Sequence, residues 1–372
     1  MIPADWSNLP VELLGLIASR LPFALDYVRF GMVCRSWRRV VVENGSSPPS
    51  FLPWLMLSQK INSDLRGVCY PYKNRAFYLH LPELNNKRCW GSPFGWVVTL
   101  DSNFQLRLLN PLSRAQLMLP PLHKCPNLKN MVCSPKSFRN RFVYKAALSS
   151  SPLSLDFVVL AIYSDNEKMA ILKAGSHTWT PLECCPGYVD DAICFDGIVY
   201  IVSSSGEIVI CDCQGSVLQK IIFTPLQEEV VDPEYIAAYL VEIDGQIYVL
   251  CRLMFDTRNN DTPFHPYLRT KRFDVYKLDL GNGKWYEIQS LGDWSIFIGN
   301  NHSFSICTNE YPECDSNCIY FTDDYSGVSH NTPTSYDTGV YNLETRKIQW
   351  LAQDDISVFS FSVPVWFKPS LS

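Results

Sequence analysis

The sequence predicts an α+β multidomain protein in which a small unit of three helices precedes an all-β propeller of about six blades. Apolar residues recur at helical spacing near the N-terminus, whereas strand-like alternation dominates further along the chain. The strands of this larger part recur in similar groups of four, which is typical of propeller blades. The expected boundaries are 4–43 for the helical unit, 44–53 for a linker and 54–368 for the propeller.

Three short amphipathic helices fit within residues 5–42. Pro10 suits the first turn of a helix, where no amide donor is needed, and Pro22 ends that helix. Each helix has one predicted apolar stripe, formed by Leu13, Leu14, Ile17, Ala18 and Leu21, then by Leu25, Val28, Met32 and Val33, then by Val33, Trp37, Val40 and Val41. A unit of under about 40 residues rarely buries a core alone. It therefore needs either a partner protein or the larger domain of its own chain, which it would cap.

This helical segment resembles an F-box. The resemblance rests on Leu9-Pro10-Val11-Glu12-Leu13-Leu14, Ile17, Arg20-Leu21-Pro22, Asp26, Arg29 and Val33-Cys34-Arg35-Ser36-Trp37-Arg38. It implies a three-helix module that docks onto a Skp-type adaptor and, through it, onto a cullin. The adaptor-binding residues that the resemblance implies are Leu9, Pro10, Leu13, Ile17, Leu21, Val33, Cys34 and Trp37.

The composition argues against nucleic-acid and membrane partners and against secretion. The formal net charge of −5 gives no general attraction to phosphate backbones, so nucleic-acid binding is not expected. The first residues lack a basic start and an apolar core, which predicts no signal peptide. No apolar stretch reaches the roughly 18 residues of a membrane span. We expect a soluble protein of the nucleus or cytoplasm, with no membrane partner.

The 14 cysteines are expected to be reduced, because the chain is expected to stay inside the cell. Their spacing does not match a zinc site: Cys184 and Cys185 are adjacent, and Cys314 and Cys318 lack a second pair. Buried free thiols in strands are the expected state, and no metal or cofactor is predicted.

The larger domain begins after a stretch rich in Gly, Ser and Pro, residues 43–53, which reads as a linker. Residues 95–100 and 105–110 form a predicted hairpin. An Asp-Gly turn followed by a Tyr-containing strand occurs at 195–202 and 243–250, with a looser copy at 315–322. Strands with Val-Tyr and turns followed by Trp recur after them.

These recurrences place blade units near 54–120, 155–182, 190–223, 239–291 and 304–352, the first of which has room for more than one blade. The alternating run 358–363 is predicted to complete the ring with an early strand. A two-sheet β-sandwich is the alternative, although sandwiches lack this recurring order of Asp-Gly, Tyr and Trp.

This domain resembles the kelch-like C-terminal propeller of a large plant F-box family. The resemblance rests on Leu109-Asn110-Pro111-Leu112-Ser113-Arg114, Leu119-Pro120-Pro121-Leu122, Phe273-Asp274-Val275-Tyr276 and Ile319-Tyr320-Phe321-Thr322-Asp323-Asp324. It covers 54–352 in patches, and the unit at 155–182 departs from the pattern because it lacks an Asp-Gly pair.

No catalytic residue is predicted. The sequence lacks a G-x-S-x-G elbow, a phosphate-binding P-loop and an H-E-x-x-H helix, and its six His are scattered, so surface or loop positions are expected for them. The acidic pairs Asp190-Asp191, Asp323-Asp324 and Asp354-Asp355 fall at predicted turns, where solvated carboxylates are expected.

Two polar segments, 258–272 and 323–337, are longer than a hairpin requires and are candidates for target binding, the first with a basic end. No individual target-binding residue can be named.

The combined reading is a non-catalytic substrate-recognition subunit of an SCF-type ubiquitin ligase, whose propeller binds an unidentified target protein. A scaffold or sequestering protein that does not promote degradation is the main alternative. An enzyme with its site in the propeller channel is a third.

Overall fold

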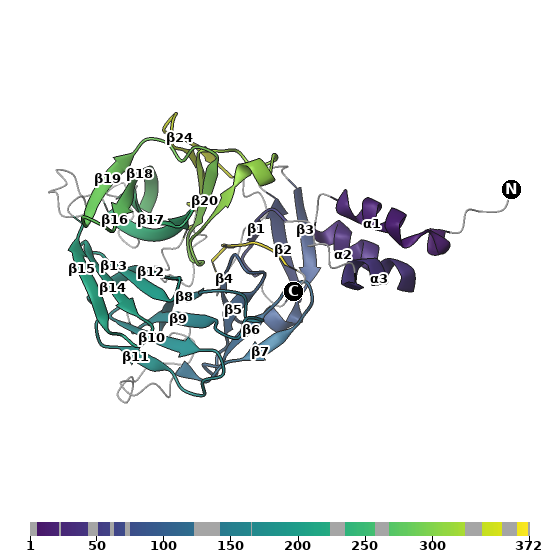
Figure 1. Cartoon of the computed structure of the whole chain (residues 1–372), viewed down its shortest axis with the longest axis horizontal. Coiled ribbons are helices and arrows are strands. Elements are labelled where there is room, and N and C mark those ends of the chain that lie inside the picture. The colour runs from purple at the N-terminus through teal and green to yellow at the C-terminus, as the bar shows by residue number, and fades with distance from the viewer. Residues whose placement is uncertain are drawn as a thin grey trace, which may run out of the picture.

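The computed structural model describes residues 6–21, 24–43, 51–59, 63–70, 75–122, 142–164, 166–223, 235–256, 268–323, 337–351 and 363–370. Three helices are followed by a ring of β-sheets, and the helices lie outside the ring beside β3 (Figure 1). The helices are α1 (Val11–Ser19), α2 (Ala24–Met32) and α3 (Arg35–Glu43).

Six sheets, numbered here as blades 1 to 6, form the ring. Blade 1 contains β1 (Trp54–Met56), β2 (Leu65–Tyr70), β3 (Arg75–His80) and β25 (Val365–Phe367), and blade 2 contains β4 (Arg88–Gly91), β5 (Val97–Leu100), β6 (Leu106–Leu109) and β7 (Gln116–Met118). Blade 3 contains β8 (Val143–Leu148), β9 (Val158–Tyr163), β10 (Lys168–Lys173) and β11 (Thr180–Leu182), and blade 4 contains β12 (Val189–Phe195), β13 (Ile198–Ser203), β14 (Glu207–Asp212) and β15 (Val217–Ile222). Blade 5 contains β16 (Tyr235–Ile243), β17 (Gln246–Asp256), β18 (Leu268–Asp279) and β19 (Lys284–Ile288). Blade 6 contains β20 (Trp294–Ile298), β21 (Phe304–Cys307), β22 (Cys318–Phe321), β23 (Gly339–Asn342) and β24 (Lys347–Trp350).

The predicted six-bladed propeller is confirmed, and the β-sandwich alternative is wrong. The first predicted unit, 54–120, covers two blades. The third blade begins at β8, earlier than the predicted 155. Blade 6 has five strands, because β20 pairs in parallel with β22 and β21 lies on its other side.

The Asp-Gly turns have the conformation that a tight hairpin requires. Asp196 and Gly197 have φ values of 49° and 73°, and Asp244 and Gly245 have the same two values. Two successive residues with positive φ match the right-handed twist of the flanking strands, which explains why this dipeptide marks both turns.

The ring closes by pairing the two ends of the propeller. β25 runs antiparallel to β1, with Trp54 opposite Phe367 and Met56 opposite Val365. The predicted closing run 358–363 lies outside the described residues except for its last position. The closing strand itself follows it, and its residues Val365, Trp366 and Phe367 are all buried.

Hydrophobic clusters fill the seams between blades. Among the described residues there is one cluster for each of the six seams, and the cluster between blades 1 and 2 also contains Leu14, Ala18, Tyr27, Phe30 and Val40 of the helices. The helices and the propeller therefore share one apolar core.

The innermost strands carry a buried polar network. Lys145 Nζ lies 2.7 Å from Asp191 Oδ1, and neither side chain is more than 4% exposed. The other carboxylate oxygen accepts hydrogen bonds from Ser303 Oγ at 2.9 Å and from the Leu240 amide at 3.1 Å. This one carboxylate joins blades 3, 4 and 5 to the β20–β21 connection of blade 6.

The prediction that Asp191 is solvated is wrong. Asp191 lies within β12, and the neighbouring strands β8 and β16 pack against β12 and cover it. A carboxylate there requires a cationic partner and amide donors, and the neighbouring blades supply both.

His302 is buried beside this network, contrary to the surface or loop position expected for it. Its ring packs edge-on against Phe94 with centroids 5.9 Å apart. Burial, and secondarily the Lys145 charge, lowers the pKa of His302 to about 3. Because this pKa is below the ordinary 6.5, protonation favours the unfolded state.

We expect the free energy of unfolding to fall by about 1.4 kcal/mol for each pH unit below 6.5 through this residue alone. His302→Gln should remove that slope, whereas His177→Gln, at an exposed position, should leave it unchanged. Urea denaturation at pH 7.0, 6.0 and 5.0 measures the difference. Equal slopes in the wild type and His302→Gln would contradict the assignment.

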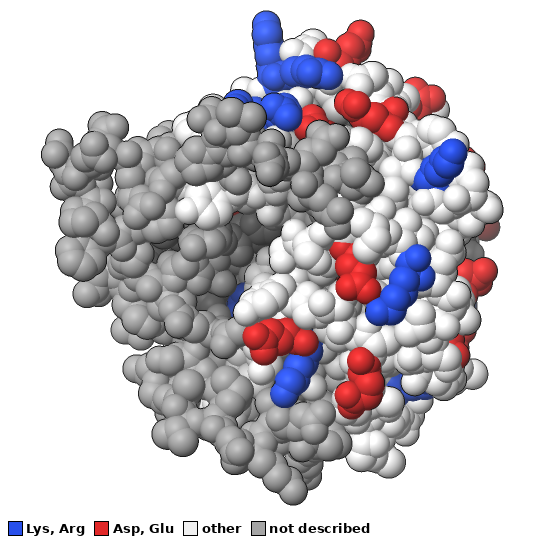
Figure 2. Space-filling model, turned by 90° about the vertical axis from the view of Figure 1, so that its left-hand side faces the viewer, with Lys and Arg blue, Asp and Glu red and all other residues white. Residues whose placement is uncertain are grey.

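The described surface on one side of the ring mixes charges of both signs, and most of it is uncharged (Figure 2). Within the described ranges, no helix has the length and apolar character needed to cross a membrane.

Candidate functional site

The helix α1 begins at Pro10 and has two different apolar faces. The Pro10 carbonyl accepts hydrogen bonds from the amides of Leu13 and Leu14, both at 3.1 Å. Leu14 and Ala18 are buried against the shared core, whereas Leu13 and Ile17 are 46% and 38% exposed.

The single predicted stripe is therefore wrong. Adjacent helical residues point about 100° apart, so Leu13 and Leu14 face different directions. The inner face holds the helix to its own chain, and the outer face is a free apolar surface.

Half of the predicted adaptor-binding residues take part in the internal packing of the helices. Leu9, Leu21 and Trp37 pack against the core cluster. The Trp37 ring lies 4.3 Å from that of Phe30, and its indole N–H donates to the Trp6 carbonyl at 3.0 Å. Cys34 is half-buried, and its carbonyl accepts the Arg38 amide at 2.9 Å, which starts α3.

The other predicted residues, Pro10, Leu13, Ile17 and Val33, are exposed, Val33 to 61%. The sequence interpretation missed Leu16, which is 57% exposed and follows Leu13 by three positions on the same helix face. That spacing was the available signal. We call Leu13, Leu16 and Ile17 the outer face of α1.

The helices contact the propeller through α2 and blade 1. The Tyr27 ring packs edge-on against Phe51, with centroids 6.0 Å apart, and both residues are buried. Burial, with a smaller contribution from the Asp26 carboxylate, raises the pKa of Tyr70 at the end of β2. The inner faces of the helices thus pack against the propeller, as the alternative of a helical cap expects. The outer face of α1 stays exposed, which that alternative does not explain.

A second feature lies where blades 5 and 6 meet. Arg252 on β17 and Asp337 before β23 form an ion pair at 3.0 Å, with side chains only 1% and 2% exposed. Thr270 on β18 donates to the same carboxylate oxygen through its amide at 2.7 Å and its hydroxyl at 2.6 Å. Arg252 also donates to the Thr322 carbonyl at 2.9 Å.

This network holds the ends of both predicted target-binding segments. Arg252 and Thr270 flank the β17–β18 connection, and Thr322 and Asp337 flank the β22–β23 connection. Residues 257–267 and 324–336 lie outside the described residues, so the segments themselves stay predictions. Their described ends meet where blades 5 and 6 adjoin, joined by the Arg252–Asp337 ion pair and the hydrogen bonds around it.

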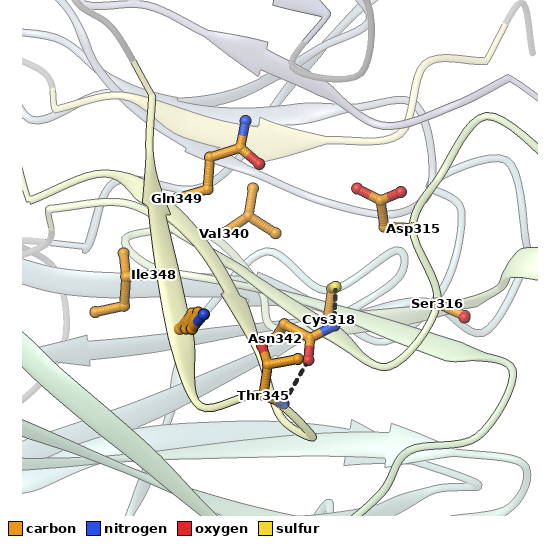
Figure 3. Close-up of a pocket in the computed structure, with 9 residues that line it drawn as sticks. Asp315, Ser316, Cys318, Val340, Asn342, Thr345, Ile348 and Gln349 are labelled. Atoms are coloured by element: carbon orange, nitrogen blue, oxygen red, sulfur yellow. Dashed lines mark hydrogen bonds between the residues drawn. The ribbon is translucent and has the colours of Figure 1, made fainter.

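A pocket of about 520 Å³ lies on blade 6, between the turn before β22 and the strands β23 and β24 (Figure 3). Asn342 spans its floor, where its amide donates to Cys318 Sγ at 3.6 Å and its carbonyl accepts the Thr345 amide at 2.8 Å. Burial raises the pKa of the Cys318 thiol to about 11, so the thiol is protonated at neutral pH and is a poor nucleophile.

The twelve described cysteines are free; half of them are buried and the other half are partly exposed, so burial does not extend to all of them as expected. No group of three or more His, Cys, Asp or Glu side chains in the described part of the chain is arranged to hold a metal ion.

Comparison with known proteins assigns both regions to families. Residues 6–46 match the F-box-like family model, and residues 68–342 match the model of the KIB1-4 beta-propeller. The F-box protein At1g65770 of Arabidopsis thaliana is 31% identical over 86% of this chain and 90% of its own length. The F-box protein SKIP23 of the same plant is 24% identical over 93% of this chain and 91% of its own.

F-box proteins are generally non-catalytic adaptor subunits, and this pair of domains fits a substrate-recognition role. With both family models matched and its relatives aligned over most of their length, the chain belongs to the plant F-box proteins that carry a KIB1-4 beta-propeller.

Proposed function

We propose that this protein is the substrate-recognition subunit of an SCF-type ubiquitin ligase. The F-box, with expected bounds 4–43, docks a Skp-type adaptor and through it a cullin, and the propeller at 54–368 binds a target protein. The observation that carries the proposal is the outer face of α1, an exposed apolar surface within an F-box match. Isolated exposed apolar residues are ordinary, but three that share one face within about one turn of a helix are typical of a helix that meets a partner.

The chain itself forms no covalent intermediate in this proposal. It holds the target near a ubiquitin-loaded enzyme, so that the reaction of a target lysine becomes effectively intramolecular. For this role we expect the protein to act in the nucleus or cytoplasm and to need no cofactor or metal.

We propose two different roles for the predicted adaptor-binding residues, according to their exposure. Leu13, Ile17 and Val33 are exposed and are proposed to contact the adaptor directly, together with Leu16 and Pro10. Leu9, Leu21, Cys34 and Trp37 are proposed to act by maintaining the helical packing that presents them.

The double variant Leu13→Glu/Ile17→Glu should lose co-purification with a recombinant Skp-type adaptor, with affinity at least about 100-fold weaker, since each buried interface leucine or isoleucine contributes about 1–3 kcal/mol. Leu155→Glu is the matched control, because Leu155 is 98% exposed on the propeller. It should bind like the wild type. Undiminished binding of the double variant, with an unchanged thermal melting curve, would refute adaptor docking by this face.

Degradation is tested separately from docking. Proteins that accumulate on the Leu13→Glu/Ile17→Glu variant, which cannot bind the adaptor, are candidate targets, and their half-lives should lengthen when that variant replaces the wild type. If the wild type binds the adaptor but the half-lives are the same with the wild type and with the variant, the result would support the non-degradative scaffold instead.

A further inference from the structure

We propose that Phe255, Arg269 and Trp350, here called the blade 5–6 patch, bind an acidic segment of the target protein. This inference rests on the proposed receptor function and names the surface and the chemistry by which the target is recognised.

The three side chains come from three strands of two neighbouring blades. Phe255 on β17 is the cross-strand partner of Arg269 on β18, so both lie on the same face of blade 5. The Arg269 guanidinium lies over the Trp350 ring of β24, 5.0 Å from its centroid. Phe255 and Trp350 are 42% and 41% exposed, which leaves an aromatic surface on either side of a cation.

The patch is fixed from below. The Trp350 ring packs edge-on against Phe321, with centroids 5.9 Å apart, and the buried Arg252 lies over Phe321 at 5.0 Å. Arg252 is the centre of the ion-pair network that joins the two blades. The Trp350 ring, and the Arg269 guanidinium over it, are thus pre-organised, so their side chains lose less conformational entropy when a partner binds.

The chemistry of the patch favours a carboxylate-bearing partner. A guanidinium that stacks on an indole keeps its N–H donors at its edge, where they match the two oxygens of a carboxylate. Among the described residues, no carboxylate is paired with Arg269. Its neighbour Arg272 is paired with Asp274 at 3.2 Å, and Lys271 between them is exposed.

The charge of the patch also differs from that of the chain, whose formal net charge is −5. The described charged neighbours of Arg269 on β18 are the exposed Lys271 and the Arg272–Asp274 pair, so the local charge is positive. Trp and Arg, with their large rigid contact areas, are among the residues that most often dominate binding energy at protein interfaces. A basic and aromatic surface on an acidic protein attracts an acidic segment and repels a basic one.

The test uses the full chain in complex with its Skp-type adaptor and two fluorescent peptide arrays. Each array contains 12-residue peptides with one aromatic position and otherwise varied sequence. One fixes Asp or Glu at four positions, and the matched array has Asn or Gln there. We expect binding to be enriched in the acidic array, with amide counterparts of the best peptides at least about tenfold weaker.

Variants then assign the binding to the patch. Arg269→Ala and Trp350→Ala should each weaken the best acidic peptides at least about tenfold, and Arg269→Lys should give an intermediate loss because the stacked plane is removed. Arg346→Ala is the control, because Arg346 is exposed on the same blade at the turn before β24. It should change affinity less than about twofold.

Equal binding to both arrays, no binding to either, or full affinity in the folded Arg269→Ala variant would overturn the proposal. Adaptor binding is measured on the same samples. If the wild type fails to bind the adaptor, the proposed function is refuted. If it binds the adaptor but binds acidic and amide peptides equally, only the proposed role of the blade 5–6 patch is refuted.

Discussion

Replacing Arg252 with methionine is expected to lower the free energy of unfolding by about 3–5 kcal/mol. The substitution removes the cation from a pair whose side chains are 1% and 2% exposed and leaves the Asp337 carboxylate buried with only neutral donors. Urea denaturation followed by tryptophan fluorescence measures the change.

Arg272→Met is the matched control on β18. Arg272 also pairs with a carboxylate, Asp274 at 3.2 Å, but the two side chains are 41% and 20% exposed. Water solvates both partners there, so we expect a loss below about 1 kcal/mol. The double variant Arg252→Met/Asp337→Leu should recover much of the lost stability, because it leaves no unpaired charge. If Arg252→Met and Arg272→Met lose the same stability, the buried pair does not have the role assigned to it.

Gly91→Ala is expected to destabilise the ring by about 3 kcal/mol or more. Gly91 ends β4, and a Cβ atom built there would overlap the Trp366 carbonyl oxygen of β25. A backbone carbonyl cannot rotate away as a side chain does, so the closing strand itself would have to shift. Thermal melting of the full chain, followed by circular dichroism, measures the effect.

Gly67→Ala provides the comparison within another strand of the same region. Its added Cβ would lie 3.1 Å from Leu57 Cδ1, the end of a flexible side chain. Leu57 can change rotamer, so the loss should stay within about 1 kcal/mol. Similar losses for the two variants would show that the close approach of β4 and β25 does not control closure.

The features that the sequence predicts well are local ones. The helices follow from Pro10 and the spacing of apolar residues, and the Asp-Gly turns at 196–197 and 244–245 follow from the positive φ that such turns need. The six-bladed ring follows from the repetition of these local signals along the chain.

The features that were missed depend on distant partners. Asp191 looks like a turn residue until Lys145 is brought beside it by the packing of β8 against β12. Arg252 and Asp337 are 85 positions apart, and neither has a local signature of a buried pair.

The candidate site shows the same division. The F-box motif predicts a set of adaptor-binding residues but not which of them are exposed, since Leu13 and Leu14 are equivalent in a list of apolar residues and opposite in their exposure. Only the tertiary packing of α1 against α3 and the core shared with blade 1 decides which face of α1 is covered.

The pairing of β1 with β25 also sets the order of events during synthesis. The two strands lie at opposite ends of the propeller, so β1 gains its partner strand only after Val365, Trp366 and Phe367 have emerged from the ribosome. At translation rates of about 5–20 residues per second, the roughly 310 residues between them take about 15–60 seconds. Throughout that interval the first blade has an unpaired apolar edge, and the protein is most exposed to misassembly before its final strand exists.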